Sequence, residues 1–416
     1  MNSIMRRMNI LGWAAAFLAL TLSCSKTPDI QDPEAGLPPF PKAEHEIDRV
    51  PLTRAEEAFV LAGNQFAWKL TKKVWDEGEK KSLILSPLSV QYALGMLGNG
   101  ADAEVSAQLA AVLGYEGTDA INEFCAKLIE TLPQVDKSVT LALADGVLVN
   151  DKFTPKAPFK SAVETYYSAL VESMSFSDPQ AVMKYVNGWC EKHTYGRIKE
   201  VLKQVNPAAI MYIMNAIFFH ADWTTAFDKA ATRDEKFRNL AGATAKVGMM
   251  HQTLDAAYGE NDFGQAVTLP YGNGKFALTV YLPAKNDALT TLPDAKQLPL
   301  AGEKCHVILS LPRFETENTV EMKDLLVAMG LPVGPYTELV ENDTAVISQV
   351  IHKANITVNE TGTEAAAVTV IEMKLTSAGP DPEPRTVKFT ADHPFLYTIS
   401  ERTSGAILFT GLYNGD

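Results

Sequence analysis

Residues 362–376, near the end of the chain, alternate between two kinds of side chain with a period of two. Because successive strand residues point to opposite sides of a sheet, this pattern predicts a strand of roughly 14 residues with one buried and one solvent-facing side. No turn signal stands where a hairpin should reverse, and the prolines of the next residues, "SAGPDPEPR", cannot extend a sheet. The fold must therefore accommodate a segment that is a strand in some circumstances and an exposed loop in others. The small or apolar side comprises Thr363, Ala365, Ala367, Thr369, Ile371, Met373 and Leu375; the other side carries every charge and comprises Glu364, Ala366, Val368, Val370, Glu372, Lys374 and Thr376.

The chain of 416 residues is 46% hydrophobic, which is enough to bury a large core. No Pro/Gly-rich linker divides its body, so we expect one domain from about residue 52 to residue 416. Its formal net charge of −13 and the lack of a Lys/Arg-rich run disfavour nucleic-acid binding.

The N-terminal residues, "MNSIMRRMNILGWAAAFLALTLSCSK", combine a basic head with an apolar run that is too short to cross a membrane as a helix. Residues 1–23 are therefore interpreted as an export signal. The Ser23-Cys24 pair resembles a bacterial lipobox, in which the thiol is lipidated and becomes the new N-terminus. Simple cleavage and secretion is the alternative. Residues 24–51 are proline-rich and acidic, typical of a flexible tether. These features predict an outer-membrane-anchored lipoprotein on the periplasmic or the cell-surface face.

Three cysteines remain after Cys24: Cys125, Cys190 and Cys305. Their wide spacing fits neither a disulfide framework nor a metal site, so we expect small buried hydrophobes. We expect no metal and no cofactor.

Helical spacing of apolar residues predicts an amphipathic helix from Arg54 to about Trp75. Strand-like runs gather in the second half of the chain, which predicts an α+β fold with large, mostly antiparallel sheets. They include "KFALTVYLPA", "CHVILSLPRF", "AVISQVIHKANITV", "HPFLYTI" and "GAILFTGLY".

An enzyme is not indicated, because the chain has no G-x-S-x-G, H-E-x-x-H, P-loop or G-x-G-x-x-G motif. His352 lies in an apolar strand-like run, and its interpretation as a hydrogen-bonded core histidine is favoured over catalysis.

The stretch "HKANITVNETGTEAAAVT" resembles the hinge signature of the serpins, the serine protease inhibitor family. The resemblance continues in ordered blocks over nearly the whole domain. "ILSPLSVQYALGMLGNGA" resembles the family's Ser-Pro-x-Ser segment, and "VNGWCEKHTYGRI" resembles its Asn-x-Trp…Thr-x-Gly pattern. Further similar blocks are "MNAIFFHADWTTAF", "VTLPYGNGKFALTVYLP", "SLPRFETE" and "ADHPFLYTI…GAILFTGLYN".

The resemblance implies a serpin fold with three β-sheets, about eight or nine helices and an exposed reactive-centre loop at about residues 360–386. It also implies a monomeric protein that is not an enzyme but a suicide inhibitor of serine endopeptidases and of some cysteine proteases. The target cleaves the loop, the loop inserts as an extra strand into the central sheet, and the acyl-enzyme is trapped.

Site residues follow from the same resemblance. The hinge residues are Glu360, Gly362, Thr363, Glu364, Ala365, Ala366 and Ala367. Glu360 is expected to pair with Arg313, a charge-assisted contact near Trp223 at the top of the sheet. Residues beneath the sheet, where polar contacts rearrange as strands part, are Ser86, Ser89, Asn215 and His352.

The family's spacing from Glu360 places the cleaved bond at Thr376-Ser377, with Lys374-Leu375 as the second choice. Thr376 suits an elastase-like protease and Lys374 a trypsin-like one, whereas Leu375 or Met373 suits a chymotrypsin-like one. The alternatives are a serpin that does not inhibit proteases and a surface lipoprotein that binds ligands. The hinge lacks the bulky, charged or proline residues that hinder insertion, which favours inhibition.

Overall fold

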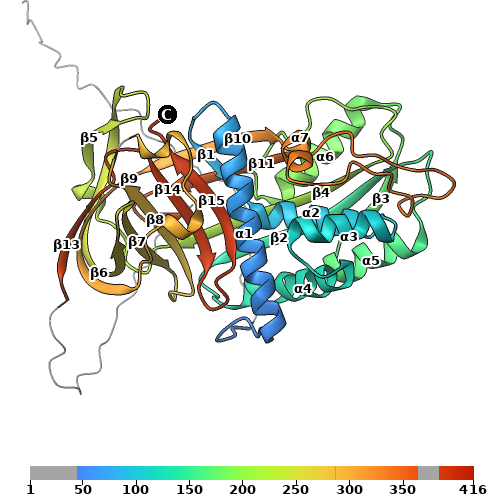
Figure 1. Cartoon of the computed structure of the whole chain (residues 1–416). Coiled ribbons are helices and arrows are strands. Elements are labelled where there is room, and N and C mark those ends of the chain that lie inside the picture. Colours follow the sequence, from blue (N-terminus) through green and yellow to red (C-terminus); the bar gives the residue numbers. More distant parts are fainter. Residues whose placement is uncertain (1–44, 286, 364–383) are drawn as a thin grey trace, which may run out of the picture. The chain divides into compact units, whose positions relative to one another are not determined.

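The computed structural model describes residues 45–285, 287–363 and 384–416 (Figure 1). All of these residues belong to one compact unit. The predicted bounds of the signal, tether and domain stay predictions, and Cys24 lies outside the described residues.

Helices dominate the first half of the described chain and strands dominate the second, so the α+β prediction is confirmed. The α-helices are α1 (Arg54–Glu77), α2 (Pro87–Gly98), α3 (Ala103–Leu113), α4 (Thr118–Thr131), α5 (Ala157–Tyr167), α6 (Pro179–His193) and α7 (Lys323–Ala328). The strands are β1 (Leu83–Leu85), β2 (Thr140–Asn150), β3 (Leu170–Met174), β4 (Met211–Asp222), β5 (Arg233–Arg238), β6 (Thr244–Glu260), β7 (Gly264–Tyr271), β8 (Phe276–Pro283), β9 (Glu303–Pro312), β10 (Phe314–Glu321), β11 (Ile351–Val358), β12 (Gly362–Thr363), β13 (Thr386–Thr390), β14 (Phe395–Glu401) and β15 (Ile407–Tyr413).

The predicted first helix is confirmed as α1. It begins at a capping box in which Thr53 and Glu56 satisfy each other's backbone N–H groups. Its apolar stripe is buried, with Leu70 fully inaccessible to solvent. The pattern that predicted the helix is therefore the face that holds it against the core.

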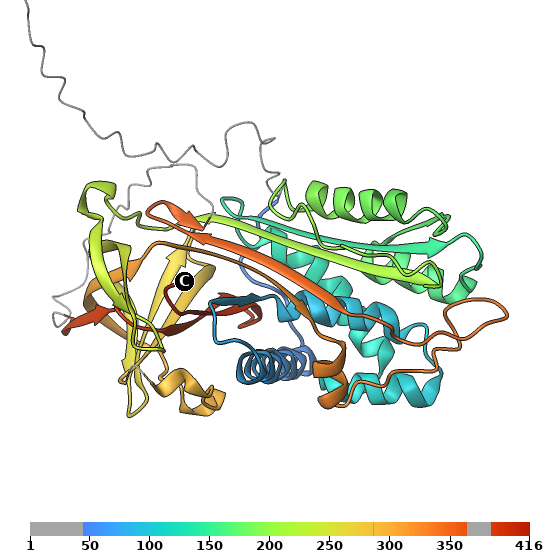
Figure 2. The same ribbon diagram turned by 90° about the horizontal axis from the view of Figure 1, so that it is seen from above.

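The sheet that carries the hinge has six strands in the order β10-β11-β12-β4-β2-β3. Figure 2 shows α6 over one face of this sheet and the group of helices that includes α2 over the other. Ile217 and Phe219 of β4 join the main core on the α2 side, whereas Met214 and Ala216 pack with Trp189 of α6 on the opposite side. Both faces of β4 are therefore covered.

The other strands form a nine-stranded sheet, so the described residues make two hydrogen-bonded sheets instead of the expected three. The cause is the length of β6. One end of β6 pairs with β5, its middle pairs with β9, and its last residues pair with β7, which joins strand groups that would otherwise be separate sheets.

The number of helices also differs from the expected eight or nine. Over the described ranges, seven segments are α-helical and four more are single 3-10 turns. The 3-10 turns are Leu132–Gln134, Lys229–Ala231, Ala288–Thr290 and Ala295–Gln297, and each is too short to reach a full α-helical turn.

The ordered body begins before residue 52, inside the stretch expected to be tether. The backbone N–H of Ile47 donates to Gln134 O at 2.9 Å, and Lys275 Nζ donates to Ile47 O at 2.8 Å. Val50 is buried in the main core. Ile47 and Val50 pack in or against the main core, which holds this part of the acidic stretch against the domain.

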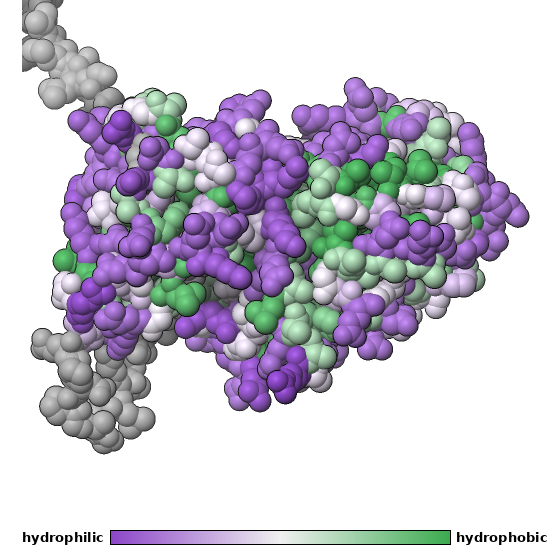
Figure 3. All heavy atoms as spheres, in the orientation of Figure 1, coloured by the Kyte–Doolittle hydropathy of each residue, from purple (hydrophilic) through white to green (hydrophobic). Residues whose placement is uncertain are grey.

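The face seen in Figure 3 is mostly polar, with hydrophobic residues gathered in places between charged ones. Large apolar side chains that are exposed include Leu61, Leu170, Leu300, Ile308, Val327, Val333 and Val346. Within the described ranges, no helix is both long and apolar enough to cross a membrane.

Candidate functional site

The six-stranded sheet has a seam at which β11 and β4 are not hydrogen-bonded neighbours. The two-residue strand β12 stands between them: Thr363 pairs with Val358 of β11 and with Ala221 of β4, and Gly362 pairs with Asp222. β11 and β4 are 8 and 12 residues long. β12 therefore fills only the end of the seam where β11 and β4 finish, which we call the top of the seam.

The turn from β11 into β12 is fixed by Asn359. Its side-chain oxygen accepts from the backbone N–H groups of Thr361 and Gly362 at 2.9 and 3.2 Å, and its own N–H donates to Gly362 O at 2.9 Å. An Asn side chain that replaces backbone acceptors in this way is a standard means of reversing the chain. The hinge is therefore held in the sheet by local bonds as well as by its neighbours.

Gly362 is required by the close approach of β4. A Cβ at this position would lie 2.1 Å from Ala221 O and 2.7 Å from Asp222 Cα. Its φ is not in the left-handed region, so the close contact with β4 explains the glycine.

Thr363 is almost fully buried, at 2% exposure. Its hydroxyl shares a 2.5 Å hydrogen bond with Tyr271 Oη, and the Tyr271 ring stacks on Trp223 with centroids 4.3 Å apart. Trp223 Nε1 donates to Asn359 O at 2.9 Å, and the Trp223 backbone N–H donates to Thr361 O at 2.8 Å. The hinge thus docks on two stacked aromatic rings.

Glu360 and Arg313 approach each other at the top of the seam. Arg313 Nη1 lies 3.8 Å from Glu360 Oε1, at the long end of an ion pair. Glu360 is buried and its backbone carbonyl accepts from Phe227 N at 2.8 Å, whereas the Arg313 side chain is 46% exposed. Arg313 directly follows β9, so the contact links the nine-stranded sheet to the hinge.

Beneath the sheet, the first turn of α2 holds both sides of the seam. Ser86 is its N-cap, and its backbone N–H donates to His352 Nε2 of β11 at 3.0 Å. The Ser89 hydroxyl donates to Asn215 Oδ1 of β4, and Asn215 Nδ2 donates to Asp145 Oδ1 of β2 at 2.7 Å. One helix turn therefore bonds to the strand on each side of the seam.

His352 has the environment of a core histidine. Its Nε2 accepts a hydrogen bond, so this nitrogen carries no proton. Burial lowers the pKa of His352 to about 4, which keeps the ring neutral at physiological pH.

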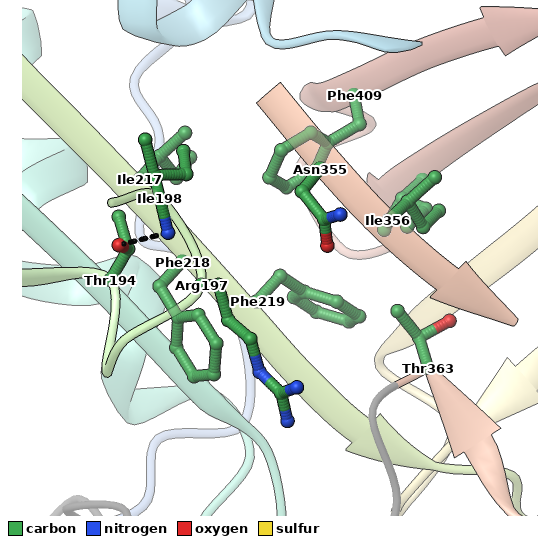
Figure 4. A pocket seen from close by; sticks show the side chains of 11 residues that line it. Thr194, Arg197, Ile198, Ile217, Phe218, Phe219, Asn355, Ile356, Thr363 and Phe409 are labelled. Carbon is green, nitrogen blue, oxygen red and sulfur yellow. Dashed lines mark hydrogen bonds between the residues drawn. The ribbon is translucent and has the colours of Figure 1, made fainter. Parts of the chain in front are cut away.

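A narrow cavity of about 20 Å³ lies in the seam below Thr363. Figure 4 shows Ile217 and Phe219 from β4, Ile356 from β11 and Phe409 from β15 around it. The walls are mostly apolar, which suits them to apolar side chains entering between the strands. Among the described residues, no group of three or more His, Cys, Asp or Glu side chains is placed to hold a metal.

The structure therefore brings together the sequence-predicted residues Glu360, Gly362, Thr363, Trp223 and Arg313 at the top of the seam and Ser86, Ser89, Asn215 and His352 beneath it. The remaining predicted site residues lie outside the described residues: Glu364, Ala365, Ala366, Ala367, Lys374, Leu375, Thr376 and Ser377.

Sequence reasoning missed three residues of this site. Asn359 holds the turn and Tyr271 receives Thr363, but nothing in their local patterns marks them. Asp145 had a signal, because it is the only charge in the β2 sequence "TLALADGVLVN". A lone acid in a buried strand is rare unless it has a partner.

The family model described as "Serpin (serine protease inhibitor)" matches residues 61–414 of the chain. The chain belongs to the serpin family. Its α+β architecture is the serpin fold, as predicted from the sequence.

Individual relatives agree with this assignment. The chain is 30% identical over 368 residues to an uncharacterised serpin-like protein of Thermococcus kodakarensis, covering 86% of this serpin and 85% of the relative. The native structure of tengpin, a thermophilic serpin, superposes with a TM-score of 0.75 at 27% identity, covering 90% of this chain and 98% of tengpin. Human thyroxine-binding globulin in complex with its hormone gives a TM-score of 0.75 at 25% identity, with 86% and 98% covered.

The three buried cysteines Cys125, Cys190 and Cys305 are free, as predicted. Burial raises the pKa of the Cys190 thiol to about 12, so it is not a nucleophile.

Proposed function

We propose that this serpin is a suicide inhibitor of serine endopeptidases. The protease cleaves the segment that follows the hinge, and the freed segment inserts into the seam while still bound to the enzyme as an acyl ester. Insertion carries the protease away from its starting position and distorts its active site, so that hydrolysis of the ester stops.

The observation that carries this proposal is the partly filled seam. Among the described residues, only Gly362 and Thr363 stand between β11 and β4, although both strands continue well beyond them. A central strand gains hydrogen bonds on both edges, so each further inserted residue lowers the free energy of the inserted state.

The register of β12 predicts which residues of β4 and β11 each inserted residue would contact. Thr363 is opposite both Ala221 and Val358. If the antiparallel register continues, Thr369 comes opposite Asn215 and His352, and Met373 comes opposite Met211, the first residue of β4. In this register the seam along β4 would hold the segment as far as Met373.

The same register places the small and apolar side of the segment on the α2 side of the sheet. Ala365, Ala367 and Ile371 would lie beside Phe219, Ile217 and Ile213 of β4, which belong to the main core or pack against it. The charges of Glu364, Glu372 and Lys374 would point to the other side. The apolar side of the segment would therefore face the apolar core, and its charged side would face away from it.

We place the cleaved bond at Thr376-Ser377, with Lys374-Leu375 as the second choice. Both bonds follow Met373, the last residue that the seam would hold in this register, so the cleaved end would emerge beyond Met211 at the start of β4. An elastase-like target follows from the first choice and a trypsin-like target from the second.

The test is incubation with elastase-, trypsin- and chymotrypsin-like proteases, followed by denaturing electrophoresis. We expect an SDS-stable covalent complex with at least one of them, and mass spectrometry of the released C-terminal peptide to begin at Ser377 or Leu375. Cleaved serpin with fully active protease across the whole panel would exclude inhibition. A peptide that begins elsewhere would exclude both bonds.

A serpin that does not inhibit proteases is the second candidate, favoured by the similarity to thyroxine-binding globulin. That protein is named for a bound hormone rather than for a protease. The two candidates differ after cleavage: a serpin that cannot insert its loop keeps its melting temperature, whereas one that inserts gains a central strand and melts at a much higher temperature.

We further propose that the chain is exported and anchored by a lipid on Cys24. Expression in a bacterial host with a radiolabelled or clickable fatty acid tests this. Label on the wild type and none on Cys24→Ala is expected. Release of the unlabelled wild type into the soluble fraction would show simple cleavage instead.

A further inference from the structure

Asp145 stands out in the sequence of β2 because it is the only charged residue in a run of small and apolar ones. In the structure it is 6% exposed and pairs with Asn215 of β4. Within the described residues, no cation lies within ion-pair distance of its carboxyl group. A buried acid without a cation is costly to keep ionised.

The hydrogen bonds of Asp145 favour a neutral carboxyl group. Its Oδ1 accepts from Asn215 Nδ2 at 2.7 Å. Its Oδ2 is buried and has no hydrogen-bond partner among the described residues. One neutral amide donor does not compensate a carboxylate for lost water, since an ionised carboxylate offers about four acceptor sites.

Among the described residues, the titratable groups that face Asp145 are neutral near physiological pH. Tyr92 approaches from α2, Cys125 from α4 and Tyr167 from α5, and burial raises the pKa of all three. β4 contributes the uncharged Asn215, and His352 of β11, which bonds to the same turn of α2, has a pKa lowered by burial. Burial raises the pKa of Asp145 itself to about 7, against a smaller opposite effect of the Asn215 hydrogen bond.

Asp145 is bonded into the network that spans the seam. Asn215 links it to Ser89, and Ser86, in the same turn of α2, bonds to His352 on the far side. When β4 separates from β11, these two serines cannot keep both partners, so the layer between the sheet and α2 must loosen. A looser layer admits water to the carboxyl group and lowers the cost of its charge.

We propose that Asp145 makes the opening of the seam depend on pH: its neutral form favours the closed sheet, and its ionisation favours separation of β4 from β11. The physical basis is linkage, because a group that ionises more easily in one state draws the protein toward that state. This regulation rests on the proposed function only in that the seam is where the cleaved loop would insert. The protein would then open more readily in neutral or slightly alkaline surroundings than in acid ones.

The experiment measures the opening of the seam without a protease. Full-chain protein is mixed with a fluorescent peptide that copies residues 364–375, and the rate of its stable uptake is measured from pH 6 to pH 8. The ionised fraction of a group with a pKa of about 7 rises about tenfold over this range. We expect the wild-type rate to rise about tenfold, and the rate of Asp145→Asn to be independent of pH and no higher than the wild-type rate at pH 6.

Asp136→Asn is the matched control. Asp136 is also buried, but it accepts from Ser138 and Asn273 and is not bonded to the seam network. Its variant should keep the tenfold rise. The same rise in Asp145→Asn, or a flat wild-type profile, would overturn the proposal.

Infrared difference spectroscopy of the wild type keeps the test valid if Asp145→Asn does not fold. The C=O stretch of a buried protonated carboxyl group should disappear with a midpoint near pH 7. A midpoint near pH 4, where ordinary Asp titrates, would also overturn the proposal. If no protease of the panel is trapped but peptide uptake depends on pH, inhibition is rejected and the pH dependence stands. If a protease is trapped but peptide uptake does not depend on pH, the pH dependence is rejected and inhibition stands.

Discussion

Replacing Thr363 with arginine tests whether insertion begins at the hinge. Thr363 is the last residue of β12, it is 2% exposed, and its hydroxyl is bonded to Tyr271. The cavity directly beyond it is lined by apolar side chains such as Ile217 and Ile356. An arginine at this position would have to leave water for an apolar seam before any other residue of the segment could enter.

The cost follows from the burial of an unpaired charge. Leaving one charge of a buried pair uncompensated costs about 3–5 kcal/mol, and each 1.4 kcal/mol is about a factor of ten. The inserted hinge would therefore become about a hundredfold to several thousandfold less populated. Hydrolysis of the acyl ester would then finish before insertion, and the protease would treat Thr363→Arg as a substrate.

The assay is the stoichiometry of inhibition, measured with the protease that forms a complex with the wild type. Thr363→Arg should be cleaved at the same bond with almost no complex. Thr363→Ser, which keeps the hydroxyl and the small size, should trap the protease as the wild type does. Undiminished trapping by a folded Thr363→Arg protein would refute the account of insertion through this position.

Three further variants test neighbouring parts of the site. Gly362→Ala would bring a methyl group against the β4 backbone, so we expect less complex and more cleaved serpin on denaturing gels, whereas Gly188→Ala, in open space on α6, should trap normally. Arg313→Ala and Glu360→Gln should each lower the melting temperature. Because the two side chains are 3.8 Å apart and the arginine is half exposed, a double-mutant cycle should give a coupling energy of about 1 kcal/mol or less. A coupling energy of several kcal/mol would contradict this geometry. His352→Gln should remove the loss of stability that the wild type suffers from this ring between pH 6.5 and pH 4, measured by denaturant unfolding at several pH values.

The sequence predicted the first helix and several strands of the nine-stranded sheet. The helix from Arg54 shows a helical period because only one side of it is buried, and β8, β9, β14 and β15 overlap runs recognised as strands. The run "AVISQVIHKANITV" was predicted as a strand throughout, but only its second part, Ile351–Val358, is one. Its first part lies in the loop that leads up to β11, where β propensity alone cannot form a ladder without a partner.

β4 carries no strand pattern in the sequence, although it is the strand on which the site depends. Its sequence "MYIMNAIFFHAD" is apolar on both sides because α6 covers one face and α2 the other, so the alternation that marks a strand is absent. Asn215 was expected beneath the sheet from the resemblance to the serpins, and Asp145 is marked as a lone charge in β2, but the bond between them was not predicted. Their partners come from β2 and α2, and no spacing along the chain reveals contacts that only the fold creates.

The two titrating groups beside the seam have opposite effects on stability. The pKa of His352 is lowered to about 4 by burial, so its neutral ring leaves the free energy of unfolding undiminished above pH 6.5. As the pH falls from 6.5 to about 4, the free energy of unfolding decreases by about 3 kcal/mol for a shift of this size. For Asp145, with a pKa raised from 3.8 to about 7, stability is present below pH 3.8 and is lost as the pH rises through 7, by about 4 kcal/mol as an upper bound. Between pH 4 and pH 6.5 the two slopes largely cancel, so a flat wild-type profile there would conceal both groups. Above pH 6.5 only the Asp145 effect continues, which is why the opening of the seam should respond to pH between 6 and 8 rather than in acid.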